Sequence, residues 1–129
     1  MRLRSGRLLA VLLVVGGLAC AGSRSHRAHP DMSLITREQI EAKDFHTAFD
    51  VVAALHSNWL SARGPDTLLG RPSEVLVYLD DTRLGGVETL RTIEIGLIVY
   101  IRHFDGKAAT ARWGVGHGQG VILVSTHPM

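Results

Sequence analysis

The sequence has little cysteine, few aromatic residues and no long hydrophobic run. Cys20 is its single cysteine, so the chain cannot form an internal disulfide. Aromatic residues make up 5% of the chain, which leaves aliphatic side chains to form most of a core. A membrane-spanning helix needs about 20 apolar residues, whereas residues 8–18 give a run of eleven apolar residues and glycines. We therefore expect a fold that is stabilised by packing alone.

The chain also lacks a basic surface once its amino terminus is set aside. It contains 14 Lys and Arg residues against 12 Asp and Glu residues. Arg2, Arg4 and Arg7 lie before Cys20 and no acidic residue does, which leaves 11 basic against 12 acidic side chains in the remainder. Nucleic-acid binding depends on basic side chains that neutralise phosphates. We therefore expect no nucleic-acid partner.

The first twenty residues have the organisation of a bacterial lipoprotein signal. A basic head and the apolar run of residues 8–18 lead to the small residue Ala19, and Cys20 follows directly. The arrangement resembles a lipobox, and it predicts a signal peptide at residues 1–19 and lipidation of Cys20, for example with palmitate. Neither Ala21 nor Gly22 is an acidic retention signal, which favours the outer membrane. The alternative is a conventional secreted protein with an accidental cysteine at the cleavage site.

Residues 20–33 have the composition of a flexible tether. Met32 is their only large apolar side chain, too little to offset the entropy of ordering the segment. His26 and His29 have a spacing that could suit a metal, but no third or fourth ligand lies nearby in the sequence. We therefore predict no metal and no cofactor, and one domain at residues 34–127.

The first half of that domain predicts two helices. Thr36 and Gln39 fit a capping box at the start of a short helix over residues 37–43. A second helix is expected after Asp44 as its N-cap. Its inner face should carry apolar residues at steps of three and four, which are Phe45, Phe49, Val52 and Leu55.

The second half predicts strands that alternate with short helices. Strands are expected at residues 74–79, 82–84, 95–103 and 120–126, with a turn at Asp80 and Asp81. Helices are expected at residues 87–91 and from Asp105 or Gly106 onward, the latter carrying three small residues, Ala108, Ala109 and Ala111. This order indicates a small α/β (α+β) domain in which short helices pack on a mixed sheet.

Three segments in this order resemble the plug domain of TonB-dependent outer-membrane receptors. Residues 34–40 read LITREQI, and residues 75–86 read VLVYLDDTRLGG, which is similar to the family's strand ending Y-[LIV]-D-G-[VT]-[RP]. Residues 109–126 read ATARWGVGHGQGVILVST, similar to the closing motif A-x-x-x-Y-G-x-G-x-x-G-G-V-I-x-[VI]-x-T. The chain differs at Asp81 and Gln119, where the family has glycine, and at Trp113, where it has tyrosine.

The resemblance implies a plug-like fold and a role connected with outer-membrane transport. In the family a large β-barrel follows the plug, whereas this sequence ends three residues after the closing motif. We therefore expect a lipid-anchored docking module without transport activity of its own. Its expected partners are membrane lipid, through Cys20, and an outer-membrane barrel or receptor protein. The alternatives are a lipoprotein that binds a small ligand or the cell wall, and an enzyme.

The sequence gives little support for catalysis. Glycines at 114, 116, 118 and 120 precede a strand and not a helix, so they do not form a dinucleotide-binding loop, and we expect them to allow tight turns. Asp80 and Asp81 are expected to be exposed turn acids. The histidines show no triad or zinc spacing. We therefore predict that the protein is not an enzyme.

The turns and loops are the expected working surface, because helices should cover the faces of the sheet. The candidate interaction residues are Asp80, Asp81, Arg83, Trp113 and His117. An exposed tryptophan is a typical binding anchor. The alternative for Trp113 is a core position in place of the family's tyrosine.

Overall fold

The computed structural model describes residues 31–62 and 74–129. The predicted signal peptide, Cys20 and most of the expected tether lie outside the described residues. Within these two ranges, none of the helices has both the length and the apolar character that crossing a membrane would require.

Five strands form one mixed sheet in the order β1-β4-β5-β2-β3. The strands are β1 (Leu34–Thr36), β2 (Leu76–Leu79), β3 (Thr82–Gly86), β4 (Tyr100–Phe104) and β5 (Val121–Ser125). The central strand β5 runs parallel to β2 and antiparallel to β4, whereas β1 and β3 form the two edges. The predicted class, a small mixed sheet with short helices, is confirmed.

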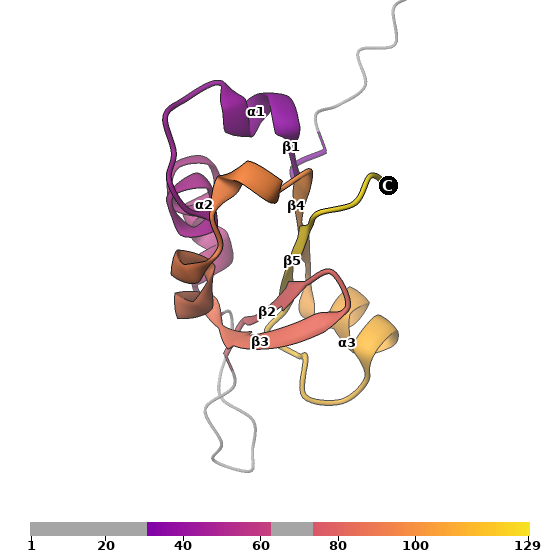
Figure 1. The fold of residues 1–129 in the computed structure, drawn as a ribbon. Coiled ribbons are helices and arrows are strands. Elements are labelled where there is room, and N and C mark those ends of the chain that lie inside the picture. Colours follow the sequence, from indigo (N-terminus) through magenta and orange to yellow (C-terminus); the bar gives the residue numbers. More distant parts are fainter. Residues whose placement is uncertain (1–30, 63–73) are drawn as a thin grey trace, which may run out of the picture.

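Short helices cover the two faces of this sheet. The α-helices are α1 (Arg37–Glu41), α2 (Ala48–His56) and α3 (Gly106–Trp113), and the 3-10 helices are η1 (Ser57–Leu60), η2 (Val87–Thr92) and η3 (Ile95–Leu97). Figure 1 shows α2 on one side of the sheet and α3 on the other. The domain therefore has two cores, one on each face.

Side-chain caps determine where the helices start. The predicted capping box of α1 is present, with the Thr36 N–H donating to Gln39 Oε1 at 2.9 Å. The predicted N-cap of α2, Asp44, is wrong by three residues. Thr47 caps the helix instead, because its hydroxyl accepts from the Asp50 N–H while the Asp50 carboxylate accepts from the Thr47 N–H.

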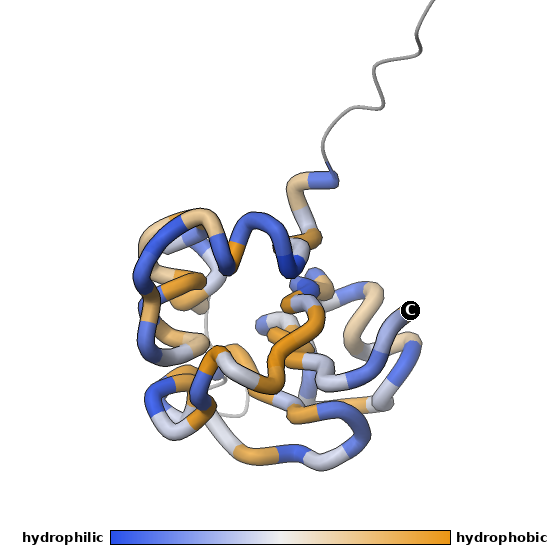
Figure 2. The backbone as a smooth tube through the Cα atoms, turned by 45° about the horizontal axis from the view of Figure 1, so that its top comes forward, coloured by the Kyte–Doolittle hydropathy of each residue, from blue (hydrophilic) through white to orange (hydrophobic). Residues whose placement is uncertain are grey.

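The larger core lies between the sheet and α2. Its fully buried side chains are almost all aliphatic and come from strands β1, β2, β4 and β5, from α1 and α2, and from η2, for example Ile35, Val52, Val77, Leu90 and Ile122. Of the four residues expected on the inner face of this helix, Val52 is fully buried and Phe49 and Leu55 are partly buried against this core. Phe45 also packs against the core but lies before α2 begins. In Figure 2 apolar residues gather toward the middle of the domain, while the outer turns are mostly hydrophilic.

The expected strand over residues 95–103 is only partly present. Ile95–Leu97 forms the 3-10 helix η3, and β4 starts at Tyr100. The carbonyl groups of Ile95 and Ile98 accept hydrogen bonds from Arg37 Nη1, at 2.9 and 2.6 Å. This contact between α1 and the turned segment spans about 60 residues of sequence, so local hydrophobicity does not reveal it.

The smaller core lies between the sheet and α3. Leu76, Tyr78, Val121 and Leu123 are buried here together with Ala109, the single buried alanine of α3. Tyr100, Phe104 and Trp113 pack against them while remaining partly exposed. This face is therefore rich in aromatic side chains, in a chain that has few.

Candidate interaction surface

The turn between β2 and β3 presents most of the predicted hairpin residues to solvent. Asp81, Thr82 and Arg83 are exposed, as expected, and Thr82 opens β3. Asp80 adopts a positive φ of 51°, a conformation that Asp and Asn tolerate better than most residues. The turn is thus built around Asp80 and exposes the residues that follow it.

Asp80 itself is not the simple exposed turn acid that the sequence suggested. Its side chain is 29% exposed, and its carboxylate accepts hydrogen bonds from the Thr126 N–H at 2.9 Å, the Thr126 hydroxyl at 2.8 Å and the Ser125 hydroxyl at 3.1 Å. Burial alone would raise the pKa of Asp80, but the bonds from Thr126, His127 and Ser125 outweigh it and lower this pKa from 3.8 to about 2. Asp80 therefore fixes the hairpin to the end of β5.

His117 lies beneath the surface and not on it. Its side chain is 7% exposed, with Nε2 2.8 Å from the Tyr78 hydroxyl and Nδ1 2.9 Å from the Gly114 carbonyl oxygen. Because a carbonyl only accepts, Nδ1 is assigned the proton and Nε2 accepts from the tyrosine hydroxyl. His117 is therefore buried and does not offer the exposed contact that was expected of it: Nε2 joins the loop to Tyr78 of β2, and Nδ1 bonds to Gly114 within the loop.

Trp113 packs within the smaller core. Its ring centroid lies 5.1 Å from that of Tyr78 and 5.1 Å from that of Phe104, the latter in an edge-on arrangement. The Arg112 guanidinium lies 4.8 Å from the Trp113 ring. Trp113 is half-buried, and these contacts favour the core alternative over the role of a fully exposed anchor.

The glycine-rich loop between α3 and β5 makes tight turns, as the sequence analysis proposed. Gly114, Gly116 and Gly120 have φ values of 88°, 98° and 100°, which side-chain-bearing residues rarely adopt. A Cβ at Gly120 would lie 2.7 Å from the Phe104 carbonyl oxygen. Val115, between Gly114 and Gly116, is 98% exposed.

The structure brings Arg83 of the hairpin and the glycine-rich loop to the same side of the sheet. Tyr78, two residues before the turn, bonds to His117 in the loop, and Arg83 is the register partner of Tyr78 in β3. Side chains of register partners project from the same face. We use the name hairpin–loop surface for the exposed residues of this region, Asp81, Thr82, Arg83, Leu84 and Val115.

A stack of three rings on the opposite face was not anticipated. Trp59 lies between His56, with ring centroids 4.3 Å apart, and His103, at 5.2 Å. Burial lowers the pKa of His56. The spacing of three residues between His56 and Trp59 is a usable sequence signal, whereas His103 comes from β4 and could not be paired with them.

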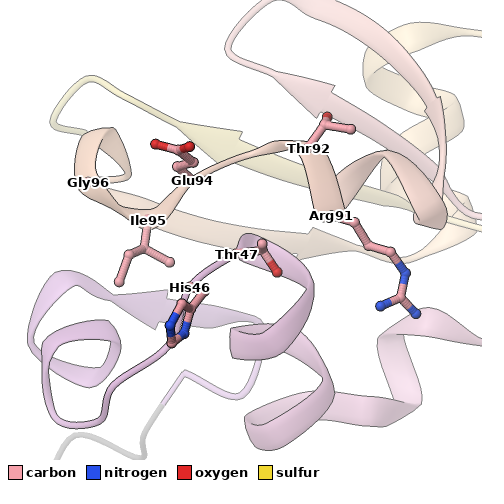
Figure 3. A pocket seen from close by; sticks show the side chains of 7 residues that line it. All are labelled: His46, Thr47, Arg91, Thr92, Glu94, Ile95 and Gly96. Carbon is pink, nitrogen blue, oxygen red and sulfur yellow. The ribbon is translucent and has the colours of Figure 1, made fainter.

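Two of the cavities in the described part of the chain are lined by residues outside the hairpin–loop surface. The larger, about 550 Å³, is lined by His46, Thr47, Arg91, Thr92, Glu94, Ile95 and Gly96. Figure 3 shows that its polar side chains do not converge, and the Arg91 guanidinium lies 3.5 Å from the centre of the Phe49 ring. The second, about 290 Å³, is lined by Asn58, Ser61, His103, Asp105, Gly106, Lys107, Gly118 and Gln119. In residues 31–62 and 74–129, no three His, Cys, Asp or Glu side chains are grouped so that they could hold a metal ion.

Comparisons with known proteins do not assign the chain to a family. No protein-family model matches it, and neither a curated protein nor a solved structure matches it significantly. The resemblance to receptor plug domains therefore stays a prediction from the sequence motifs.

Proposed function

We propose that this chain is a lipid-anchored envelope protein whose plug-like domain docks onto an outer-membrane receptor or barrel without catalysing a reaction. The signal and Cys20 would place it at the outer membrane, and the motif residues would form the docking surface. The role is a structural or regulatory contact in outer-membrane transport.

One observation carries the docking proposal. The two segments with the most specific motif residues, the hairpin and the glycine-rich loop, are held together by the hydrogen bond between Tyr78 and His117. The exposed residues around this bond include both charged and apolar side chains, a combination that protein contact surfaces use. The non-catalytic part of the proposal is supported by the larger cavity, whose polar groups do not converge on one point.

The anchor is tested by moving the cysteine. Cys20→Ser should shift the protein from the detergent phase to the soluble fraction, because acyl chains contribute about 0.8 kcal/mol per buried methylene to membrane binding. Cys20→Ser combined with Ser23→Cys is the matched control, since it keeps one cysteine but moves it away from Ala19. If either variant still partitions with detergent as the natural chain does, the lipoprotein assignment is wrong.

The docking role is tested by site-specific crosslinking in intact cells. A photo-crosslinking residue at position 83, on the hairpin–loop surface, should yield an adduct with an outer-membrane barrel protein. The same residue at position 97 is the control, because Leu97 is 78% exposed but lies on η3. Equal adducts from both positions, or none from position 83, would contradict the proposal.

The second cavity supports an alternative, a lipoprotein that binds a small polar ligand or a cell-wall fragment. Its lining offers hydroxyl, amide, carboxylate and ammonium groups within about 290 Å³. Binding of muropeptides to the purified domain, lost in Asn58→Ala, would favour this alternative. An enzyme is the remaining alternative, and hydrolysis of an ester, phosphate or peptide panel that is lost on changing His103 would establish it.

A further inference from the structure

The two edges of the sheet differ in how their outward backbone groups are satisfied. At the β1 edge, the Leu34 N–H donates to the Asp31 carbonyl oxygen at 3.0 Å, and the Thr36 N–H donates to Gln39 Oε1 at 2.9 Å. Neither bond belongs to the ladder with β4, so both amides point away from it and are bonded within the chain. The β1 edge is therefore closed to a further strand, as natural edge strands often are.

The β3 edge is open by comparison. β3 pairs with β2 alone, through Thr82, Arg83, Gly85 and Gly86, and the register shifts at Leu84, which has no partner. On either side of this bulge, alternate residues of an antiparallel pair direct their N–H and C=O groups away from the neighbour. Thr82, Arg83 and Leu84 are exposed along it. Figure 1 shows β3 at the border of the domain, with no helix in front of it. Unpaired groups in such a row are a template for a further strand.

The open edge lies far from the point where the amino-terminal segment joins the domain. That segment enters at Asp31 beside β1, and the strand order places β1 and β3 at opposite edges, about 19 Å apart at the usual strand spacing. A protein held to the membrane through its amino terminus would thus present β3 away from the attached edge. A strand bound there would not compete with the anchor.

The side chains along the edge indicate the chemistry of the bound segment. Arg83 is exposed, and within the described residues no carboxylate lies at ion-pair distance from its guanidinium. Leu84, the next residue of β3, is an exposed apolar side chain. A matching segment carries a carboxylate beside Arg83 and an apolar side chain beside Leu84.

We infer that β3 accepts an extended peptide segment of a partner protein as a sixth strand, with an acidic side chain facing Arg83. A second copy of this chain fits less well, because edge-to-edge contact over five residues buries far less than the about 800 Å² per partner typical of specific interfaces. A peptide can instead also contact the hairpin–loop surface. Only the location of the partner in the envelope rests on the proposed function.

The test uses the full chain with Cys20→Ser, so that membrane attachment plays no part. A phage-displayed library of random twelve-residue peptides is selected on this protein, and the enriched peptides are synthesised. We expect alternating apolar residues with at least one Asp or Glu, and amide-exchange protection confined to β3. Methylation of alternate backbone nitrogens of the peptide should weaken binding at least tenfold, because a sixth strand needs those N–H groups.

Three variants complete the test. Leu84→Lys should weaken peptide binding at least tenfold, and Arg83→Glu should shift selection toward peptides with Lys or Arg. Leu97→Lys makes the same change at an exposed leucine elsewhere and should stay within twofold of the natural chain. Unchanged melting temperatures of all three establish that they fold.

Several outcomes overturn the inference. These are the absence of an alternating consensus, indifference to backbone methylation, or protection at β1 in place of β3. A concentration-dependent dimer that Leu84→Lys abolishes would assign the edge to a second copy instead. Peptide binding at β3 by a chain whose Cys20 proves unlipidated would leave the inference standing and remove the envelope anchor alone.

Discussion

The two faces of the sheet are covered by different kinds of side chain. The face under α2 is packed almost entirely with aliphatic side chains, and most of the fully buried residues lie on it. The face under α3 has fewer buried residues, and its aromatic side chains surround a buried histidine that is hydrogen-bonded at both ring nitrogens.

This difference indicates that the two faces have different roles, one in the stability of the domain and one in the shape of its surface. Burial of aliphatic surface contributes roughly 25 cal/mol per Å² to the free energy of folding. A polar group that is buried in such a core without a hydrogen bond destabilises the fold. The aromatic face combines apolar area with specific hydrogen bonds, which fix one loop geometry. The first face therefore supplies most of the stability, while the second positions the hairpin–loop surface.

The largest expected effect comes from the aliphatic face. Ile122→Ala should lower the free energy of unfolding by about 2–5 kcal/mol, because Ile122 is fully buried on the central strand and its truncation leaves a cavity. Urea unfolding measures the change. Val115→Ala, at an exposed site, is the control and should stay within about 0.5 kcal/mol. A smaller loss for Ile122→Ala than for any change on the aromatic face would reverse the comparison.

Trp113→Ala should have the next largest effect and lower the free energy of unfolding by about 2–3 kcal/mol. Truncating a fully buried aromatic side chain costs about 3–5 kcal/mol. The Trp113 indole is half-buried, so we expect a smaller loss of stability. Thermal melting measures stability, and crosslinking from position 83 measures docking. An unchanged melting temperature with lost docking would assign Trp113 to the contact surface and not to the core.

Acid should weaken the attachment of the hairpin to β5. The pKa of Asp80 is lowered from 3.8 to about 2, so its contribution is present above about pH 4 and is lost as the pH falls toward 2. Asp80→Asn should cost about 1–2 kcal/mol at pH 7, because solvent weakens the bonds of a partly exposed carboxylate, and should flatten the pH dependence of unfolding in this window. Asn tolerates the positive φ of this position. The exposed neighbour Asp81→Asn is the control and should leave the profile unchanged.

The smallest effect is expected from the bond beneath the loop. Tyr78→Phe should cost about 1 kcal/mol, because it removes one hydrogen bond and leaves His117 Nε2 buried without a partner. Tyr100→Phe is the matched control, since the Tyr100 hydroxyl bonds to none of the described residues. Amide exchange across residues 114–120 should rise in Tyr78→Phe alone. Equal exchange in the two variants would show that the aromatic packing holds the loop without this bond.

Local patterns were sufficient for most of the fold. The buried runs of β2 and β5 and the capping box of α1 follow from neighbouring residues, so the sequence predicts them correctly. One error is local, the N-cap of α2, because the bonds between Thr47 and Asp50 span three residues. The other errors arise where distant groups decide the outcome. The turned segment at η3 depends on Arg37, and the burial of His117 depends on Tyr78, 39 residues away.

The candidate surface was predictable in part for the same reason. Exposure of Asp81 and Arg83 follows from turn chemistry, which is local. The bonds from Thr126 to Asp80 form only when β5 lies beside β2, and the ring stack at Trp59 needs His103 from β4. Which side chains meet across the sheet is a property of its strand order, and short-range periodicity does not contain it.

The seam between β1 and β4 has a mechanical consequence. Any tension transmitted through the residues before Asp31 reaches the domain at β1, whose ladder with β4 has three register pairs where the ladder between β4 and β5 has five. This short seam is also where two arginines tie the segments together, Arg102 to Asp31 at 3.1 Å and Arg37 to the carbonyls at η3. Under tension along the chain, we expect the bonds of these two guanidinium groups to delay the separation of β1 from β4.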